Sequence, residues 1–187
     1  MGRGAKIAIG IGVVVLILYF LLASPYNRLV SLEEQVKQAS ANVEVVLNRR
    51  LDLIPNLVET VKGYASHERE TLEAVIKARK QAVSAGSLPE KLEANQMLSS
   101  ALSRLLVVVE RYPDLKASSN FRALQDQLEG TENRISVART RYNEAVKQYN
   151  TSIRSFPTVF LAKIMGFEAK KPFAAPEAAK QAPKVKF

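Results

Sequence analysis

The sequence contains no cysteine and no tryptophan, and His67 is its single histidine. Without cysteine, the chain forms no disulfide and offers no thiolate for nucleophilic catalysis, zinc binding or an iron–sulfur cluster. Glu68 follows His67, but the second histidine of a zinc-protease helix is missing. The residue inventory therefore excludes thiol chemistry and the common zinc sites.

Other catalytic patterns are also missing. Gly10 and Gly12 lie in an apolar run and not in a phosphate-binding loop. The carboxylates do not have calcium-loop spacing, and no base accompanies a serine nucleophile. We therefore expect a protein that is not an enzyme, with no catalytic residue, no cofactor and no metal.

The net charge of +9 is concentrated at the two ends of the chain. Residues 1–24 carry two basic and no acidic groups, residues 25–167 carry 20 and 16, and residues 168–187 carry five and two. A nucleic-acid-binding protein concentrates basic charge on its folded domain, whereas basic ends favour contact with anionic lipid. Membrane lipid is therefore an expected partner, and nucleic acid is not.

A run of eighteen uncharged residues extends from Ile7 to Ser24. As a helix it measures about 27 Å, close to the hydrocarbon thickness of a bilayer. We predict a short N-terminal stub (residues 1–6) and a transmembrane helix (residues 7–25). The alternative is a signal peptide cut after Ala23, but Leu21 then occupies a position that requires a small residue.

The side of the membrane that the following domain faces stays open. Arg3 and Lys6 precede the apolar run, and two basic residues also follow it within the range that determines orientation. The free amino terminus and the acidic Glu33 and Glu34 favour, by a small margin, a cytoplasmic N-terminus and a domain outside the cytoplasm.

Apolar residues at alternating spacings of three and four predict long helices after the anchor. The first helix extends from Asn27 to Pro55, where proline kinks or ends a helix. A second is predicted from Leu57 to about Ala85. A third begins at the capping-box pair Ser87 and Glu90 and ends before Pro113.

The last predicted helix covers Phe121–Phe156, which is 36 residues or about 54 Å. Pro157 ends it. Residues 159–167 then place Phe160, Ile164 and Phe167 on one helical face, either as a lid on the bundle or as an interfacial segment that contacts lipid. Residues 168–187 have no periodicity and are predicted to form a disordered basic tail rich in Ala, Lys and Pro.

Several motifs between Tyr26 and Phe167 together resemble the LemA family. They are Tyr26-Asn27-x-Leu29-Val30, Arg49-Arg50-x-Asp52-Leu53-Ile54-Pro55-Asn56-Leu57-Val58, Val61-Lys62-x-Tyr64-Ala65-x-His67-Glu68, Leu128-Glu129, Glu132-Asn133-Arg134-Ile135, Ala138-Arg139, Tyr142-Asn143, Tyr149-Asn150, Phe156-Pro157 and Gly166-Phe167. The resemblance implies an all-α protein of the bacterial inner membrane, with one span and an antiparallel bundle of long helices (residues 26–167). It implies no known enzymatic activity, and it suggests partners among membrane proteases and other membrane proteins.

Two sets of polar residues within these motifs are candidate sites. The first is a structural polar layer around Pro55, because buried charges persist only when paired; its predicted members are Arg50, Asp52, Asn56, Glu129, Glu132, Asn133 and Arg139. The second is an interface strip on the last helix, because two Tyr–Asn pairs seven residues apart share a face; its members are Tyr142, Asn143, Tyr149 and Asn150.

The sequence leads to three functional hypotheses. The first is a membrane-anchored scaffold that forms homo-oligomers and organises membrane partners, which the unbroken heptad pattern favours. The second is a one-to-one adaptor or accessory subunit of a membrane enzyme such as a protease. The third is membrane remodelling through the face formed by residues 160–167 and the basic tail.

Overall fold

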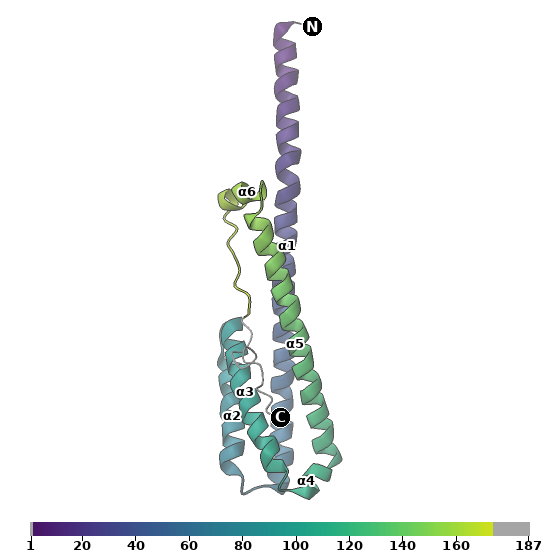
Figure 1. Cartoon of the computed structure of the whole chain (residues 1–187), viewed down its shortest axis with the longest axis vertical. Helices are drawn as coiled ribbons and strands as arrows, with labels where there is room; N and C mark the ends of the chain where they lie inside the picture. The colour runs from purple at the N-terminus through teal and green to yellow at the C-terminus, as the bar shows by residue number, and fades with distance from the viewer. Residues whose placement is uncertain (1, 174–187) are drawn as a thin grey trace, which may run out of the picture. The chain divides into compact units, whose positions relative to one another are not determined.

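A computed structural model describes residues 2–173; within the first helix, the side chains of residues 3, 5–9, 14, 15, 17, 18 and 20–22 fall outside the description. The described chain is helical and contains no β-strand, so the predicted all-α class is confirmed. Its helices (Figure 1) are α1 (Arg3–Tyr64), α2 (Arg69–Ser84), α3 (Leu88–Val109), α4 (Pro113–Ala117), α5 (Ser119–Arg154) and α6 (Thr158–Met165).

Within the residues that the structure describes, no helix is sufficiently long and apolar to cross a membrane. This result does not support the transmembrane helix predicted at residues 7–25.

The chain divides into two compact units. One contains Met1–Ala39 together with Tyr142–Phe187, and the other contains Ser40–Arg141. Each unit therefore takes part of α1 and part of α5. The second unit adds the complete helices α2, α3 and α4, and the first adds α6.

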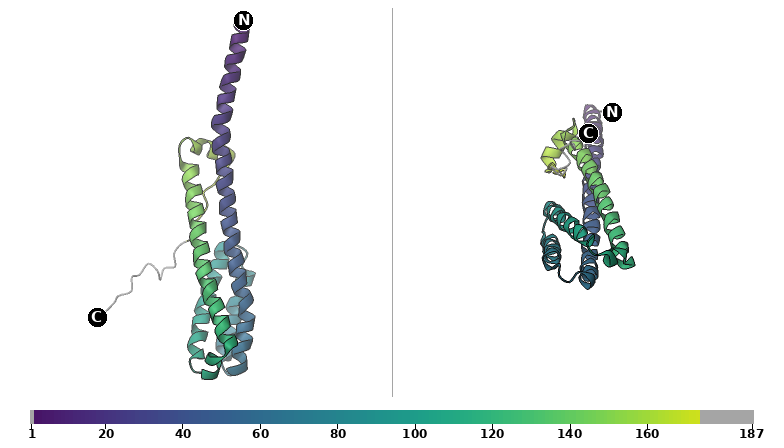
Figure 2. Two further views of the ribbon diagram at one scale, coloured as in Figure 1. Left: turned by 90° about the vertical axis from the view of Figure 1, so that its right-hand side faces the viewer. Right: turned by 60° about the horizontal axis from the view of Figure 1, so that its bottom comes forward.

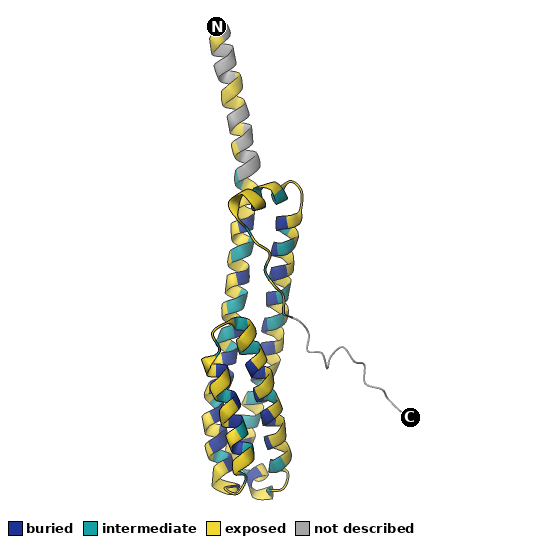
Figure 3. Cartoon of the chain, turned by 90° about the vertical axis from the view of Figure 1, so that its left-hand side faces the viewer, coloured by how far each residue is buried: buried dark blue, intermediate teal, exposed yellow. Residues whose placement is uncertain are grey.

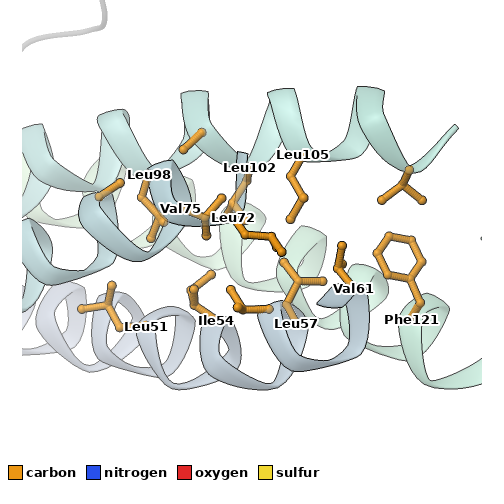
Figure 4. Packing of buried hydrophobic residues seen from close by; sticks show 14 of the residues in the cluster. Leu51, Ile54, Leu57, Val61, Leu72, Val75, Leu98, Leu102, Leu105 and Phe121 are labelled. Atoms are coloured by element: carbon orange, nitrogen blue, oxygen red, sulfur yellow. The ribbon is translucent and has the colours of Figure 1, made fainter. Parts of the chain in front are cut away.

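The second unit is built around a core of aliphatic side chains with one phenylalanine (Figure 4). Helix α2 packs along α3 (Figure 2). Ile54 of α1, Val75 of α2 and Leu98 of α3 are fully buried, and Phe121 of α5 joins the same cluster. Burying each such side chain contributes about 1.5–3 kcal/mol. This apolar cluster sets the positions of the polar groups described below.

The sequence predicts a kink or a helix end at Pro55; α1 continues through the proline to Tyr64, so a helix end at this position is wrong. Proline lacks the N–H that would bond the carbonyl of Leu51, four residues earlier. Arg79 of α2 supplies the missing donor, because its Nε lies 3.0 Å from the Leu51 carbonyl oxygen. A side chain from a neighbouring helix thus satisfies the carbonyl that Pro55 leaves free, and α1 stays unbroken.

The actual turn lies at residues 65–68, inside the helix predicted from Leu57 to Ala85. Glu68 secures it by accepting hydrogen bonds from Arg111 Nη2 at 2.9 Å and from the Tyr112 hydroxyl at 3.0 Å. Both donors follow α3, far along the chain. The sequence around the turn contains no proline, and Gly63 lies within the last turn of α1 and not at a left-handed position after it, so local patterning missed the turn.

The start of α3 and the length of α5 agree with the sequence, whereas the short helix α4 was not predicted. Ser87 and Glu90 form the predicted capping box at the start of α3. Hydrogen bonds from the backbone N–H groups of Gly86 and Ser87 lower the pKa of the Glu90 carboxyl. Helix α5 has the predicted length of 36 residues, with both ends displaced by two residues toward the N-terminus.

The first unit packs α1 against the C-terminal part of α5. Leu29 and Val36 of α1 and Val146, Tyr149 and Ile153 of α5 are buried, and buried positions recur along α5 in Figure 3. Helix α6 ends at Gly166, whose φ of 75° is the left-handed conformation that favours glycine. Residues 167–173 follow without regular secondary structure.

The role of Arg79 is testable by a double-mutant cycle in the full chain. Arg79→Met keeps an unbranched apolar stem but removes the donor, so the Leu51 carbonyl loses its partner. We expect the free energy of unfolding to fall by about 1–3 kcal/mol. In a Pro55→Ala background, which restores the helical N–H, the same substitution is expected to cost less than half as much.

Chemical denaturation followed by circular dichroism measures both effects. Equal costs of Arg79→Met in the two backgrounds would show that the arginine does not act through the freed carbonyl.

Candidate functional site

The second unit contains a buried arginine, Arg50 of α1, with 5% of its surface exposed. Its Nη1 donates to Asn95 Oδ1 at 3.0 Å and to Ser99 Oγ at 2.9 Å, both on α3. The same nitrogen lies 2.5 Å from Glu132 Oε2 on α5. Burial lowers the pKa of Arg50, while the Glu132 carboxylate acts in the opposite direction. Arg50 thus joins three helical segments through one charged group.

Only part of the predicted polar layer assembles around Arg50. Glu132 contacts it, whereas Asp52, Asn56 and Asn133 are exposed. Glu129 is exposed and accepts a hydrogen bond from Gln125, and Arg139 is half-buried. Asn95 and Ser99 were not among the predicted members of the layer, because both lie outside the motifs that resemble the LemA family. Their polar character amid the leucines of α3 was the available signal.

A cavity of about 330 Å³ lies beside this layer. Five leucines of α1, α3 and α5 form the apolar part of its wall. The remaining lining residues are polar: Arg50, Ser99, Ser103, Gln125, Glu129 and Glu132. Arg50 Nε is buried and has no hydrogen-bond partner among the described residues. This volume is at the lower end for small-molecule sites. The lining combines apolar contact with the Arg50–Glu132 ion pair and further polar side chains, which suits binding.

The second candidate site is the Tyr–Asn strip of α5 (Tyr142, Asn143, Tyr149 and Asn150), in the first unit. Asn150 Nδ2 donates to the Lys170 carbonyl at 2.7 Å, and the Lys170 N–H donates to Asn150 Oδ1 at 2.9 Å. Asn143 bonds the backbone of Phe173 in the same way, at 3.1 Å and 2.8 Å. Each asparagine amide therefore pairs with both backbone groups of one residue.

The spacing of the two asparagines fits an extended peptide. Seven residues of α-helix advance by about 10.5 Å, and three residues of extended chain advance by about 10 Å. Asn143 and Asn150 are seven apart, and their ligands Phe173 and Lys170 are three apart. The bound segment runs antiparallel to α5, returning from α6 as the yellow trace in Figure 1 shows.

Side chains add specificity to this backbone pairing. The ring of Phe173 stacks on Tyr142, with centroids 4.2 Å apart, and the Tyr142 hydroxyl donates to the Lys171 carbonyl at 3.2 Å. Lys170 Nζ lies 2.9 Å from Glu33 Oε1 and 5.8 Å from the centroid of the Tyr149 ring. The hydrogen bond with Glu33 raises the pKa of Lys170, and burial raises the pKa of both tyrosines.

The predicted interface residues are therefore in contact with the chain's own residues 170–173. The sequence placed residues 168–173 at the start of a disordered tail, yet this returning segment (residues 168–173) is bonded to α5. Composition missed it because asparagine side chains replace the periodic backbone pairing on which strand and helix patterns depend. Residues 174–187 of the predicted tail lie outside the described residues.

Helix α6 presents large apolar side chains to solvent. Phe156 just before the helix is 82% exposed, and Phe160 and Ile164 are 62% and 81% exposed. Ala162 is the buried residue of the helix. After α6, Phe167 packs edge-on against Tyr26 of α1, with centroids 6.1 Å apart. The exposed apolar face of α6 therefore lies next to a contact with Tyr26 of α1.

The sequence matches the LemA family over residues 39–187. The chain belongs to the LemA family. The resemblance seen in the motifs is thereby confirmed, and the matched region of the family extends through the returning segment to Phe187.

Relatives of this LemA-family chain include two magnetosome proteins. The chain is 28% identical over 196 residues to magnetosome protein MamQ of Magnetospirillum gryphiswaldense, covering 90% of this chain and 72% of MamQ. It is 28% identical over 201 residues to magnetosome protein MamQ 2 of Paramagnetospirillum magneticum, covering 92% and 74%. Protein LemA of Metamycoplasma hominis is 24% identical over 148 residues, covering 79% and 68%.

The charge pairing of Arg50 predicts a difference between two glutamates of α5. Glu132→Ala removes the counter-ion of a buried guanidinium, so the free energy of unfolding is expected to fall by about 1–3 kcal/mol. Glu129→Ala changes the same residue type at an exposed position and is expected to cost less than about 0.5 kcal/mol. Denaturant titration of the full chain measures both values. Equal losses of unfolding free energy in the two variants would show that the Arg50–Glu132 ion pair does not stabilise the fold.

The pairing of Asn143 with the Phe173 backbone is testable by amide hydrogen exchange, with a matched control variant. Asn143→Asp replaces the donor to the Phe173 carbonyl with a negatively charged oxygen. We expect the amides of residues 170–173 to exchange about three- to tenfold faster, the equivalent of about 0.5–1.5 kcal/mol. Asn133→Asp, at an exposed position of the same helix, is the control and leaves the rate unchanged. Unchanged exchange rates of residues 170–173 in Asn143→Asp would contradict the pairing between Asn143 and the Phe173 backbone.

Proposed function

We propose that this protein is a membrane-anchored, non-enzymatic helical scaffold of the bacterial inner membrane that self-associates and organises other membrane proteins. The observation that carries the proposal is the continuity of α1. A single helix contains the apolar residues 7–24 and the buried Leu29 and Val36 that pack in the first unit. An anchor joined to its domain by an unbroken helix has no flexible linker between them.

The exposed face of α6 also supports a position at the bilayer surface. Phe167, just after α6, contacts Tyr26, which lies two residues after the end of the apolar run at Ser24. Phe156, Phe160 and Ile164 then extend an apolar surface from that point. An amphipathic segment of this kind lies in the membrane interface. The same face is the feature that a membrane-remodelling role would use.

Self-association has support in the second unit. Ile76 and Val83 of α2 are seven residues apart, hence on one face of the helix, and are 50% and 59% exposed. Exposed apolar residues at heptad spacing are typical of helices that pack against a partner helix. Helix α2 therefore offers a face for a second copy in addition to the face that packs on α3.

The alternative is a one-to-one adaptor or accessory subunit of a membrane enzyme such as a protease. The 330 Å³ cavity beside Arg50 favours it, because an apolar cavity with an ion pair at its edge accepts an anchoring side chain of a partner.

Two measurements on native membranes test the anchor. A transmembrane helix keeps the full chain in the pellet after alkaline carbonate extraction. With the N-terminus in the cytoplasm, the orientation that the free amino terminus, Glu33 and Glu34 favour by a small margin, protease added to intact spheroplasts is expected to degrade the domain. Release by carbonate would disprove the anchor, and protection until lysis would reverse the orientation.

Crosslinking from the exposed face of α2 separates the two hypotheses. A photoreactive residue at position 83 is expected to label a second copy if the protein is a scaffold, and to label only a different protein if it is an adaptor. The buried Val75 of the same helix is the control position and is expected to give no intermolecular label. Labels confined to one other protein would overturn self-association through this face.

A further inference from the structure

The returning segment shows what the Tyr–Asn strip recognises. A lysine at the first position contacts Glu33 and the Tyr149 ring, and a phenylalanine three residues later stacks on Tyr142. The two residues between them are exposed. Their backbone contributes one contact, the Lys171 carbonyl that accepts from the Tyr142 hydroxyl. The strip therefore selects an extended Lys-x-x-Phe segment and tolerates different residues at the central positions.

The sequence contains this pattern a second time. Of its seven phenylalanines, Phe173 and Phe187 have a lysine three residues earlier. The second occurrence is Lys184-Val185-Lys186-Phe187, which begins fourteen positions after the first. Its central residues differ from Lys171 and Pro172, at the positions where the strip makes no side-chain contact.

We propose that the Tyr–Asn strip is a docking site for extended Lys-x-x-Phe segments, and that residues 184–187 of a second copy of this chain are its second ligand. In the docked state, Asn150 pairs with the backbone of Lys184 and Asn143 with that of Phe187. The Val185 carbonyl takes the place of the Lys171 carbonyl, which requires no particular side chain.

Charge and ring chemistry favour the same register. The ammonium group of Lys184 meets the Glu33 carboxylate and the face of the Tyr149 ring, as Lys170 does now. The Phe187 ring stacks on Tyr142, as the Phe173 ring does. Shifting the segment by one residue would place Val185 opposite Glu33 and remove the aromatic pair, so the register is specified at both ends.

Exchange between copies replaces each contact with an equivalent one. Each chain supplies two such segments, and its strip holds one at a time. Releasing residues 170–173 and accepting residues 184–187 of a neighbour breaks and forms the same types of hydrogen bond, ion pair and ring stack. The balance then depends on local concentration, which confinement to a membrane raises. This inference rests on the proposed self-association and supplies its linkage.

The experiment uses the full chain with a photoreactive phenylalanine analogue, p-benzoylphenylalanine, at position 187. The aromatic substitute keeps the ring that stacks on Tyr142. Equal amounts of ¹⁴N- and ¹⁵N-labelled protein are reconstituted together, irradiated and digested, and crosslinked peptides are identified by mass spectrometry. We expect crosslinks from position 187 to the α5 peptide around residue 142, with a substantial share joining peptides of different isotope.

Two variants of the tail form a matched pair. Lys184→Glu places a carboxylate opposite Glu33 and is expected to reduce the mixed-isotope crosslink at least about tenfold. Lys180→Glu makes the same charge change at a lysine that Pro183 follows at the third position, and is expected to retain the crosslink. Neither substitution changes a residue of the strip itself, Tyr142, Asn143, Tyr149 or Asn150, so the pair compares two changes in the ligand segment alone.

The outcomes are distinct. Crosslinks of a single isotope only, crosslinks away from α5, or equal signals from both lysine variants would overturn the proposal. The mixed sample also reports self-association independently, because crosslinks of different isotope elsewhere in the chain would leave the scaffold hypothesis standing while this linkage fails.

Discussion

The first unit depends on the pairing of two asparagine side chains with an extended backbone. In this unit α1 and α5 bury one face of each helix against the other, but side chains beside this contact still need to be covered. Tyr149 is fully buried and Tyr142 nearly so, and the returning segment contributes to covering both. An extended segment without a neighbouring strand needs partners for its N–H and C=O groups. Asn143 and Asn150 provide them, at a helical spacing that matches three extended residues.

The second unit meets a related requirement by different means. Its long first helix contains a proline, and the carbonyl that this proline leaves free receives Arg79 Nε. A few residues earlier, Arg50 is buried against two neutral oxygens and one carboxylate. In both cases a charged side chain completes the hydrogen bonding of an otherwise apolar bundle. These polar contacts are directional, and so they specify how α1, α2, α3 and α5 fit together within this unit.

The helices that were predictable from the sequence are those with strong local signals. The heptad pattern gave the length of α5, and the Ser87–Glu90 capping box gave the start of α3. The errors concern contacts between distant residues. The effect of Pro55 is cancelled by a side chain 24 positions away, and the turn at residues 65–68 is secured from residues 111 and 112.

In the candidate sites, too, local patterns were predictable and contacts between distant residues were not. The periodic Tyr–Asn pairs were visible as one helical face, and Arg50 and Glu132 were two of the seven polar motif residues predicted to form a layer. What bonds to them was not visible, because Asn95, Ser99 and the returning segment are joined to these residues only by folding. Four of the predicted layer residues, Asp52, Asn56, Glu129 and Asn133, are exposed and do not contact Arg50. Because a helix turns by about 100° per residue, Asp52 and Asn56 lie away from the face of Arg50.

The central claim is that this LemA-family chain works as a self-associating scaffold whose copies connect through surfaces of the helical domain. The most direct test is the mass of the full chain in mild detergent, measured by light scattering over a range of concentrations with the detergent contribution subtracted. The account predicts assemblies of two or more copies, whose share rises with concentration. A mass of one chain at every concentration and in every mild detergent would contradict it.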